Sequence, residues 1–102
     1  MDITSKLSNA KPTLKIAEGM VYEVNNSKNN ILIVDQELKK SNKSEVEVID
    51  FVVEKVLGEK ALKEINALDL SIADYKVIFI AIMACVSGMS YEEAEKNMNT
   101  PR

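Results

Sequence analysis

Few side chains in this 102-residue sequence have the types and spacing that covalent chemistry requires. The chain has no histidine, so it supplies no imidazole base and no Ser/His or Cys/His pair to activate a nucleophile. The commonest zinc ligand is missing for the same reason. The glycines do not form the pattern of a phosphate-binding loop, and no polar cluster is expected to face a cleft. We therefore expect no enzyme activity, no cofactor and no metal site.

Three serines are nucleophiles by residue type, but their spacing predicts a structural role. Ser44, Ser71 and Ser90 each precede a helical pattern by one residue, and each is followed three residues later by a carboxylate. A serine in this position accepts a hydrogen bond from the backbone N–H of that third residue and so caps the helix. We predict three helix caps instead of three reactive hydroxyls.

The single cysteine, Cys85, lies in the apolar stretch IFIAIMACVSG, with no basic residue within a helical turn. Burial disfavours the thiolate, so we expect a raised pKa and a role as a small core side chain. One cysteine cannot form an internal disulfide, and the first residues lack the apolar core of a secretory signal. Both observations predict a cytoplasmic location.

An acidic cluster near the end of the chain is the other candidate site. Glu92, Glu93 and Glu95 offer oxygen ligands for a divalent cation, but they lack the loop spacing of a calcium site. Successive carboxylates on a helix also point in different directions. We expect these side chains to face water near the positive N-terminal end of the last helix.

The charge balance and the apolar runs exclude two further classes of partner. The net charge is -3, the isoelectric point is near 5.0, and Lys and Arg gather in no single stripe. The longest uninterrupted apolar run covers residues 77–86, whereas a membrane-spanning helix needs about 20 residues. We expect no nucleic acid and no membrane as partners.

Hydrophobic periodicity divides the chain into an arm, a domain and a tail. Residues 1–12 are rich in Ser, Thr, Asn and Lys, which predicts a flexible N-terminal arm. Residues 13–24 alternate polar and apolar side chains, which predicts a β-hairpin. We expect residues 13–98 to form a single helical domain that begins with this hairpin, and residues 99–102 to form a C-terminal tail.

Helical periodicity, bounded by capping residues, predicts four to five short helices after the hairpin. Their expected ranges are about 28–40, 45–57, 59–67, 71–87 and 91–98. We therefore predict a mainly α fold, in which these helices pack around the central apolar helix and a small N-terminal β-hairpin completes an α+β domain. Gly58 and Gly88 are expected to end two of the helices, and Gly58 to adopt the left-handed conformation.

The apolar positions of these helices define the buried part of the domain. The candidate core residues are Ile49, Val53, Ile78, Phe79, Ile82 and Met83. The same pattern assigns apolar contacts to Val46, Leu68, Leu70 and Ile72. The central helix is apolar on its opposite side as well, so the rest of the domain or another chain must cover it. We expect a homo-oligomer for this reason.

Methionines near the last two helices suggest a partner-binding surface, because thioether side chains adapt to irregular partners. The candidate partner-binding residues are Met89, Tyr91 and Met98. Gap filling in the core is the alternative role for the two methionines.

Several short motifs together resemble a known family. They are Leu57-Gly58-Glu59, Lys60-Ala61-Leu62, Leu70-Ser71 with Tyr75, the apolar residues 79–84 and the Glu-rich segment 91–95. Their order resembles that of the tail assembly chaperones of long-tailed phages and prophages of Gram-positive bacteria. The resemblance covers about residues 13–98 and leaves out the N-terminal arm.

The resemblance implies a non-enzymatic role in virion assembly. Such chaperones bind the tape-measure protein, keep it soluble, assist tail-tube protein to polymerise around it, and leave the finished particle. The implied partners are therefore the tape-measure protein and the tail-tube protein, in the cytoplasm of the host cell. A small helical adaptor or regulatory protein-binding module is the alternative function, and such a module would bind one partner at a fixed ratio.

Overall fold

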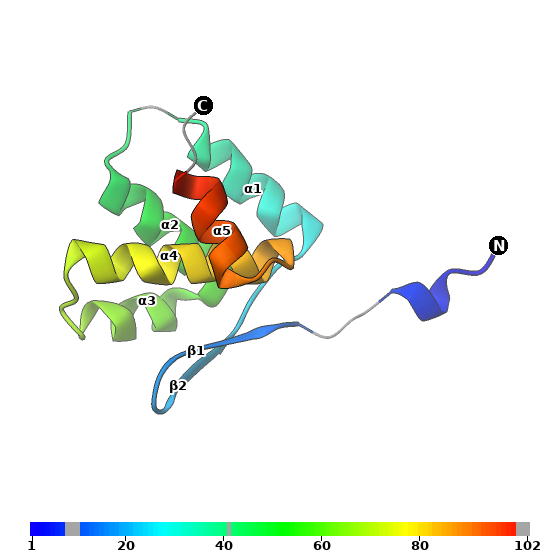
Figure 1. Cartoon of the computed structure of the whole chain (residues 1–102), viewed down its shortest axis with the longest axis horizontal. Helices are drawn as coiled ribbons and strands as arrows, with labels where there is room; N and C mark the ends of the chain where they lie inside the picture. Colours follow the sequence, from blue (N-terminus) through cyan, green and yellow to red (C-terminus); the bar gives the residue numbers. More distant parts are fainter. Residues whose placement is uncertain (8–10, 41, 100–102) are drawn as a thin grey trace.

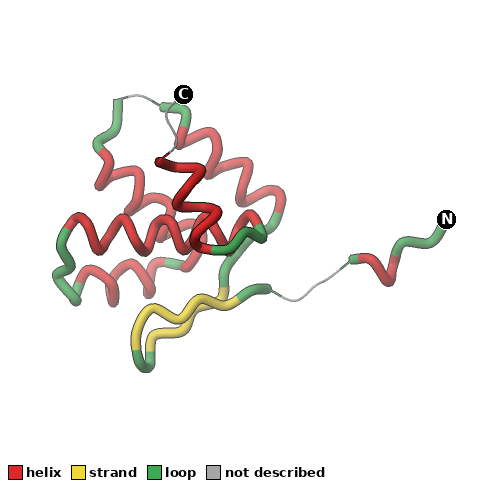
Figure 2. Tube along the Cα trace, viewed as in Figure 1, coloured by secondary structure: helices red, strands yellow, loops and turns green. Residues whose placement is uncertain are grey.

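The computed structural model describes residues 1–7, 11–40 and 42–99, and for Met98 and Asn99 it describes the backbone alone. Helices dominate this part of the chain, and a two-stranded antiparallel hairpin precedes them (Figures 1 and 2). The elements are η1 (Thr4–Lys6), β1 (Thr13–Ala17), β2 (Met20–Glu23), α1 (Lys28–Leu38), α2 (Glu45–Leu57), α3 (Glu59–Asn66), α4 (Ile72–Ser87) and α5 (Tyr91–Asn99). The predicted mainly α fold with a small N-terminal hairpin is confirmed.

Residues 1–7 of the predicted N-terminal arm lie away from the helical body in Figure 1, and residues 8–10 lie outside the described part of the chain. Residues 1–7 are all exposed, and they contain one short 3₁₀ turn, η1, that the sequence did not predict. Thr4 N–H donates to Asp2 Oδ1 at 2.9 Å, a local bond that favours this turn. Of the predicted tail, Asn99 ends α5, and residues 100–102 lie outside the described part of the chain.

Serine side chains cap the helices at the predicted positions. Ser44 Oγ accepts from Glu47 N–H at 3.2 Å, and Ser71 Oγ accepts from Asp74 N–H at 3.1 Å. Ser90 Oγ accepts from Glu93 N–H at 3.1 Å. Its own N–H donates to Glu93 Oε1, also at 3.1 Å, which completes a reciprocal capping box. These hydroxyls therefore satisfy backbone groups at helix starts, as predicted.

Two glycines end helices in different ways. Gly88 ends α4 with φ 71° and ψ 21°, the left-handed conformation that glycine adopts without strain. Gly58 has φ 105° and ψ 162°, so the prediction of a left-handed residue there is wrong. The physical reason is that α3 begins at the next residue, and one residue must end α2 and redirect the chain. Such a backbone conformation is almost restricted to glycine.

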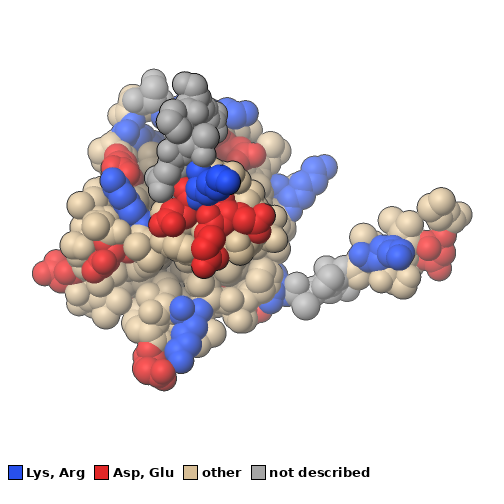
Figure 3. All heavy atoms as spheres, viewed as in Figure 1, with Lys and Arg blue, Asp and Glu red and all other residues tan. Residues whose placement is uncertain are grey.

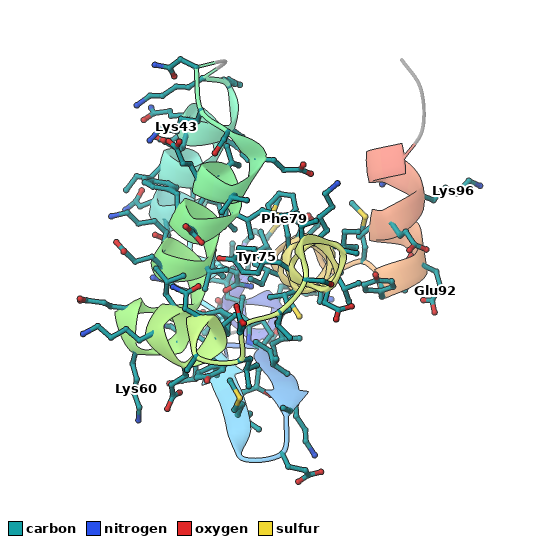
Figure 4. The ribbon with its side chains drawn as sticks, turned by 90° about the vertical axis from the view of Figure 1, so that its left-hand side faces the viewer. Lys43, Lys60, Tyr75, Phe79, Glu92 and Lys96 are labelled. Carbon is teal, nitrogen blue, oxygen red and sulfur yellow. The ribbon has the colours of Figure 1, made fainter. Side chains whose placement is uncertain are left out.

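Helix α4 contacts α2, α5 and strand β1, whereas α1 and α3 contact α2, so the helices pack around the α2–α4 pair and not around α4 alone. Four of the six candidate core residues are buried. Ile49, Val53 and Ile82 are at most 1% exposed, and Ile78 is 7% exposed. Phe79 and Met83 are half-buried and pack against this cluster. Figure 4 shows Phe79 on the side of α4 that faces α2.

The hairpin packs its alternate side chains against the helices. Leu14 lies opposite Tyr22 in the register, and both are half-buried, whereas Val21 on the other face is 54% exposed. Tyr22 Oη donates to Glu64 Oε1 of α3 at 2.6 Å, and β1 contacts α4. The hairpin is therefore held by two helices, which an isolated pair of strands needs for stability.

One carboxylate is buried near the connection between α1 and α2. The Glu37 side chain is 8% exposed, and its oxygens lie 2.7 Å from Lys43 Nζ and 3.2 Å from Lys40 Nζ. The hydrogen bond from Lys43 lowers the pKa of Glu37 below its usual value, although burial opposes this shift. This ion cluster links the residues before α2 to the end of α1.

Among the described residues, no single helix has the length and apolar character to cross a membrane. Helix α4 and residues 91–97 of α5 would reach that length together, but the chain bends by 107° between them.

Candidate functional site

A pocket of about 340 Å³ opens where the first half of α2, the end of α3 and the start of α4 meet. Four of its lining side chains are apolar: Val46, Ile65, Leu70 and Ile72. The other four are polar: Asp50, Asn66, Asp69 and Tyr75. Its volume is near the lower end of the range for ligand-binding sites, which is roughly 300–1,000 Å³.

Tyr75 and Asp50 form the polar wall between α4 and α2. Tyr75 Oη donates a hydrogen bond to Asp50 Oδ1, and Tyr75 itself is 8% exposed. Figure 4 shows the Tyr75 side chain directed from α4 toward α2. Burial raises the pKa of Tyr75, and the hydrogen bond to Asp50 raises it further. The phenol therefore stays protonated at physiological pH and serves as a fixed donor to the carboxylate.

Asp69 lies in the connection between α3 and α4. Its φ of 51° is in the left-handed region, and it is the one residue other than glycine with a positive φ in the described chain. Asp tolerates this conformation better than most residues. Asp69 N–H donates to Asn66 O at 3.1 Å, so a tight turn holds the residue at the pocket. A second carboxylate thus joins Asp50 in the lining.

Exposed apolar side chains surround this pocket. We call Val46, Leu68, Leu70 and Ile72 the apolar rim; three of them line the pocket, and Leu68 lies two residues before Leu70 in the same connection. Their exposed fractions are 44%, 41%, 37% and 48%. The prediction that these positions make buried apolar contacts is therefore wrong. They lie at helix starts and in a connection, at the edge of the pocket, where the helix packing leaves them accessible.

The site also departs from the expectation that no polar cluster faces a cleft. Asp50, Asn66, Asp69 and Tyr75 meet at one pocket although Asp50 and Tyr75 are 25 residues apart in the chain. No spacing rule connects residues on different helices, so the sequence offered no direct signal for this cluster. The Leu70-Ser71 helix entry was the nearest indication in the sequence.

The chemistry of this arrangement favours binding. Within the described residues, no group of three or more His, Cys, Asp or Glu side chains is placed to hold a metal ion. The phenol of Tyr75 has a raised pKa and is already hydrogen-bonded to Asp50, so it is a poor general base or nucleophile at neutral pH. The pocket instead offers apolar walls with fixed negative charge, which suits recognition of a complementary group.

Met89 and Tyr91, two of the three predicted partner-binding residues, lie at the opposite end of α4 from this pocket. Met89 follows α4 and is 37% exposed, and Asn97 Nδ2 lies 3.4 Å from its sulfur. Tyr91 is half-buried at the start of α5, and the side chain of Met98 lies outside the described atoms. At 1.5 Å per residue, the length of α4 separates this end from Ile72 by roughly 25 Å. The structure does not bring Met89 or Tyr91 to the pocket.

The remaining sequence candidates have structural surroundings. Cys85 is half-buried, and burial raises the pKa of its thiol, as predicted. Glu92, Glu93 and Glu95 are exposed on α5, where Figure 3 shows acidic side chains gathered. Glu93 also completes the Ser90 capping box. Their exposure agrees with the predicted solvated face.

Comparisons with known proteins identify no family or function for this chain. Searches of protein families, of curated proteins and of solved structures found no match for this chain. The pocket, its two carboxylates and the apolar rim are therefore the features on which a functional interpretation is based.

Proposed function

We propose that this chain is a non-catalytic protein-binding domain, and specifically a phage tail assembly chaperone. The observation that supports binding is the apolar rim, in which four large apolar side chains are 37–48% exposed and three of them line one pocket. Single exposed apolar residues are ordinary, but several around a pocket are typical of interaction sites.

The sequence resemblance supplies the proposed partners, the tape-measure protein and the tail-tube protein. A long helical client that has not yet been enclosed exposes apolar faces, and a small binder with an apolar rim could cover them. The net charge of -3 and the exposed acidic side chains of α5 would help to keep such a complex soluble (Figure 3). The location proposed for this activity is the cytoplasm of the host cell.

Co-expression with a tape-measure protein encoded beside this chain tests the proposal. We expect the chain to increase the soluble fraction of the long protein. A Leu68→Gln/Leu70→Gln double variant should lose this effect, because it places polar groups on the apolar rim. Leu32→Gln is the matched control, since Leu32 is 54% exposed on α1 and does not line the pocket. No gain in solubility with the unmodified chain would refute the chaperone function.

The alternative is an adaptor that binds one defined partner. The pocket favours this alternative, because a recess with fixed polar groups suits one binding site. Binding stoichiometry separates the two functions. A chaperone for a long client should bind many copies per client, whereas an adaptor should saturate at a fixed small ratio.

We also propose self-association, because α4 keeps apolar side chains at the surface. Val77 on α4 is 47% exposed, and Ile80 and Ala81 are half-buried. Light scattering over a range of concentrations should show an oligomer. A monomer at the highest concentration would contradict this expectation.

A further inference from the structure

We propose that the pocket binds a basic side chain, an arginine above all, presented by an apolar helical segment of a protein partner. The proposal rests on the protein-binding function proposed above for the nature of the partner. Beyond that function, the proposal identifies the chemical group of the partner that enters the pocket.

The first argument is charge complementarity. Asp50 and Asp69 supply two carboxylates to the lining, and no Lys or Arg is among the lining residues. Tyr75 donates to Oδ1 of Asp50, so an incoming donor can use Oδ2 and the remaining lone pairs of Oδ1. Lys76 follows Tyr75 in the chain, but its Nζ pairs with Glu45 Oε1 at 3.2 Å. The two carboxylates therefore give the pocket a local negative charge.

The adjoining end of α4 does not cancel this charge. A helix N-terminus carries partial positive charge, but Ser71 Oγ accepts a hydrogen bond from one of its free N–H groups, that of Asp74. The Asp74 carboxylate adds a negative charge in the same turn. A cationic ligand is thus favoured over an anionic one at this pocket.

The second argument is the pairing of charge with apolar walls. Val46, Leu70 and Ile72 line the pocket and remain 37–48% exposed, so they can contact the methylene groups of a long side chain. A volume of about 340 Å³ accepts one or two side chains and is small for a longer peptide segment. Leu68 precedes the lining residue Asp69 in the chain and is 41% exposed, so it is accessible to apolar residues that flank the basic one.

Arginine fits the two carboxylates better than lysine. Asp50 comes from α2 and Asp69 from the connection between α3 and α4, so the acceptors approach from two elements. A guanidinium group offers five N–H donors in a planar fork and can engage both, whereas an ammonium is a compact point charge. We therefore expect a preference for arginine at this position of the partner.

A peptide pair tests the proposal. The probe is a synthetic amphipathic helical peptide with Leu and Ala on one face, Gln on the other and one central arginine on the apolar face, and the matched peptide carries neutral citrulline in its place. Amide chemical shifts of the full chain are followed by NMR during titration at low salt. We expect the arginine peptide to shift residues 50, 69–72 and 75 and to bind at least about fivefold more tightly than the citrulline peptide.

Three variants link the binding to the carboxylates. Asp69→Asn keeps a residue that tolerates the left-handed conformation, and Asp50→Asn keeps an acceptor for Tyr75. Each should weaken binding of the arginine peptide by about threefold or more, and less so at high salt. Asp35→Asn on the exposed surface of α1 is the matched control and should leave binding unchanged. Chemical shifts of the free variants verify that each is folded.

Several results would overturn the inference. Equal binding of the arginine and citrulline peptides, or unchanged binding by a folded Asp50→Asn/Asp69→Asn double variant, would remove the role of charge. Shifts centred on Met89 and Tyr91 would place the site elsewhere, and equal binding of N-acetylarginine amide alone would indicate a small-molecule site. If the double variant still keeps the tape-measure protein soluble, this inference fails while the proposed function stands. Peptide binding without any gain in client solubility would refute the chaperone function alone.

Discussion

The burial of Ile82 on α4 predicts a large loss of stability for Ile82→Ala. Ile82 is 0% exposed and lies in the core cluster with Ile49, Val53 and Ile78. Truncation to alanine removes roughly three carbon groups, each of which contributes about 0.8 kcal/mol when buried. A residual cavity of about 50 Å³ would add roughly 1.2 kcal/mol. We therefore expect the free energy of unfolding to fall by about 3 to 4 kcal/mol.

Thermal unfolding followed by circular dichroism measures this loss. For a domain of about 100 residues, 1 kcal/mol corresponds to a shift in Tm of at least about 4 °C, so we expect Tm to fall by at least about 12 °C. Protein concentration must be the same for all samples, because self-association would make Tm depend on concentration.

Ile33→Ala on α1 is the matched control, because it makes the same substitution at an exposed position outside the proposed self-association surface. Ile33 is 44% exposed, and alanine favours helix more than isoleucine does, so the expected change is within about 0.5 kcal/mol. The reasoning would be refuted if Ile82→Ala lowered Tm no more than Ile33→Ala does. Such a result would mean that Ile82 is not enclosed by the helices of its own domain.

Three further predictions concern Glu37, Tyr75 and Gly88. In the folded state the pKa of Glu37 is lowered, chiefly by the hydrogen bond from Lys43. The Glu37 carboxylate therefore stabilises the fold at pH values above the ordinary carboxyl pKa of about 4.5, and this stabilisation is lost as the pH falls through the lowered pKa. Acid titration of Glu37→Gln should show a smaller loss of stability below pH of about 4.5. Tyr75→Phe removes the donor to Asp50 and should cost about 1 to 2 kcal/mol by urea denaturation. Gly88→Ala should cost about 1 kcal/mol by the same method, from backbone strain at φ 71°, since an added Cβ would meet no atom within 4 Å.

Each of these predictions has a contradicting outcome. Identical acid titrations of Glu37→Gln and the unmodified chain would show that the ion cluster does not form in solution. An unchanged urea midpoint for Tyr75→Phe would indicate that the hydrogen bond between Tyr75 and Asp50 does not stabilise the folded chain. A gain in stability for Gly88→Ala would mean that α4 continues beyond Gly88 instead of ending there.

The candidate site could be predicted only in part. Apolar periodicity identified Val46, Leu70 and Ile72 as interacting positions, but it assigned them to buried contacts instead of the apolar rim. Periodicity records which side of a helix is apolar and carries no information on whether a neighbouring element extends far enough to cover it. We place the proposed site at the start of α4, where the packing leaves a pocket, and the prediction that Met89, Tyr91 and Met98 bind a partner stays a prediction.

The amino-acid sequence by itself determined the helices, the hairpin and the ends of these elements. Serine caps, glycine ends and apolar periods act within a few residues, so they can be recognised without knowing the fold. Only the tertiary structure decided that Asp50 and Tyr75 meet, and that α3 begins so close to Gly58 that a glycine-specific backbone conformation is required there. It also decided which apolar side chains stay accessible. These outcomes depend on the packing of helices that are distant in the chain, and no local spacing encodes that arrangement.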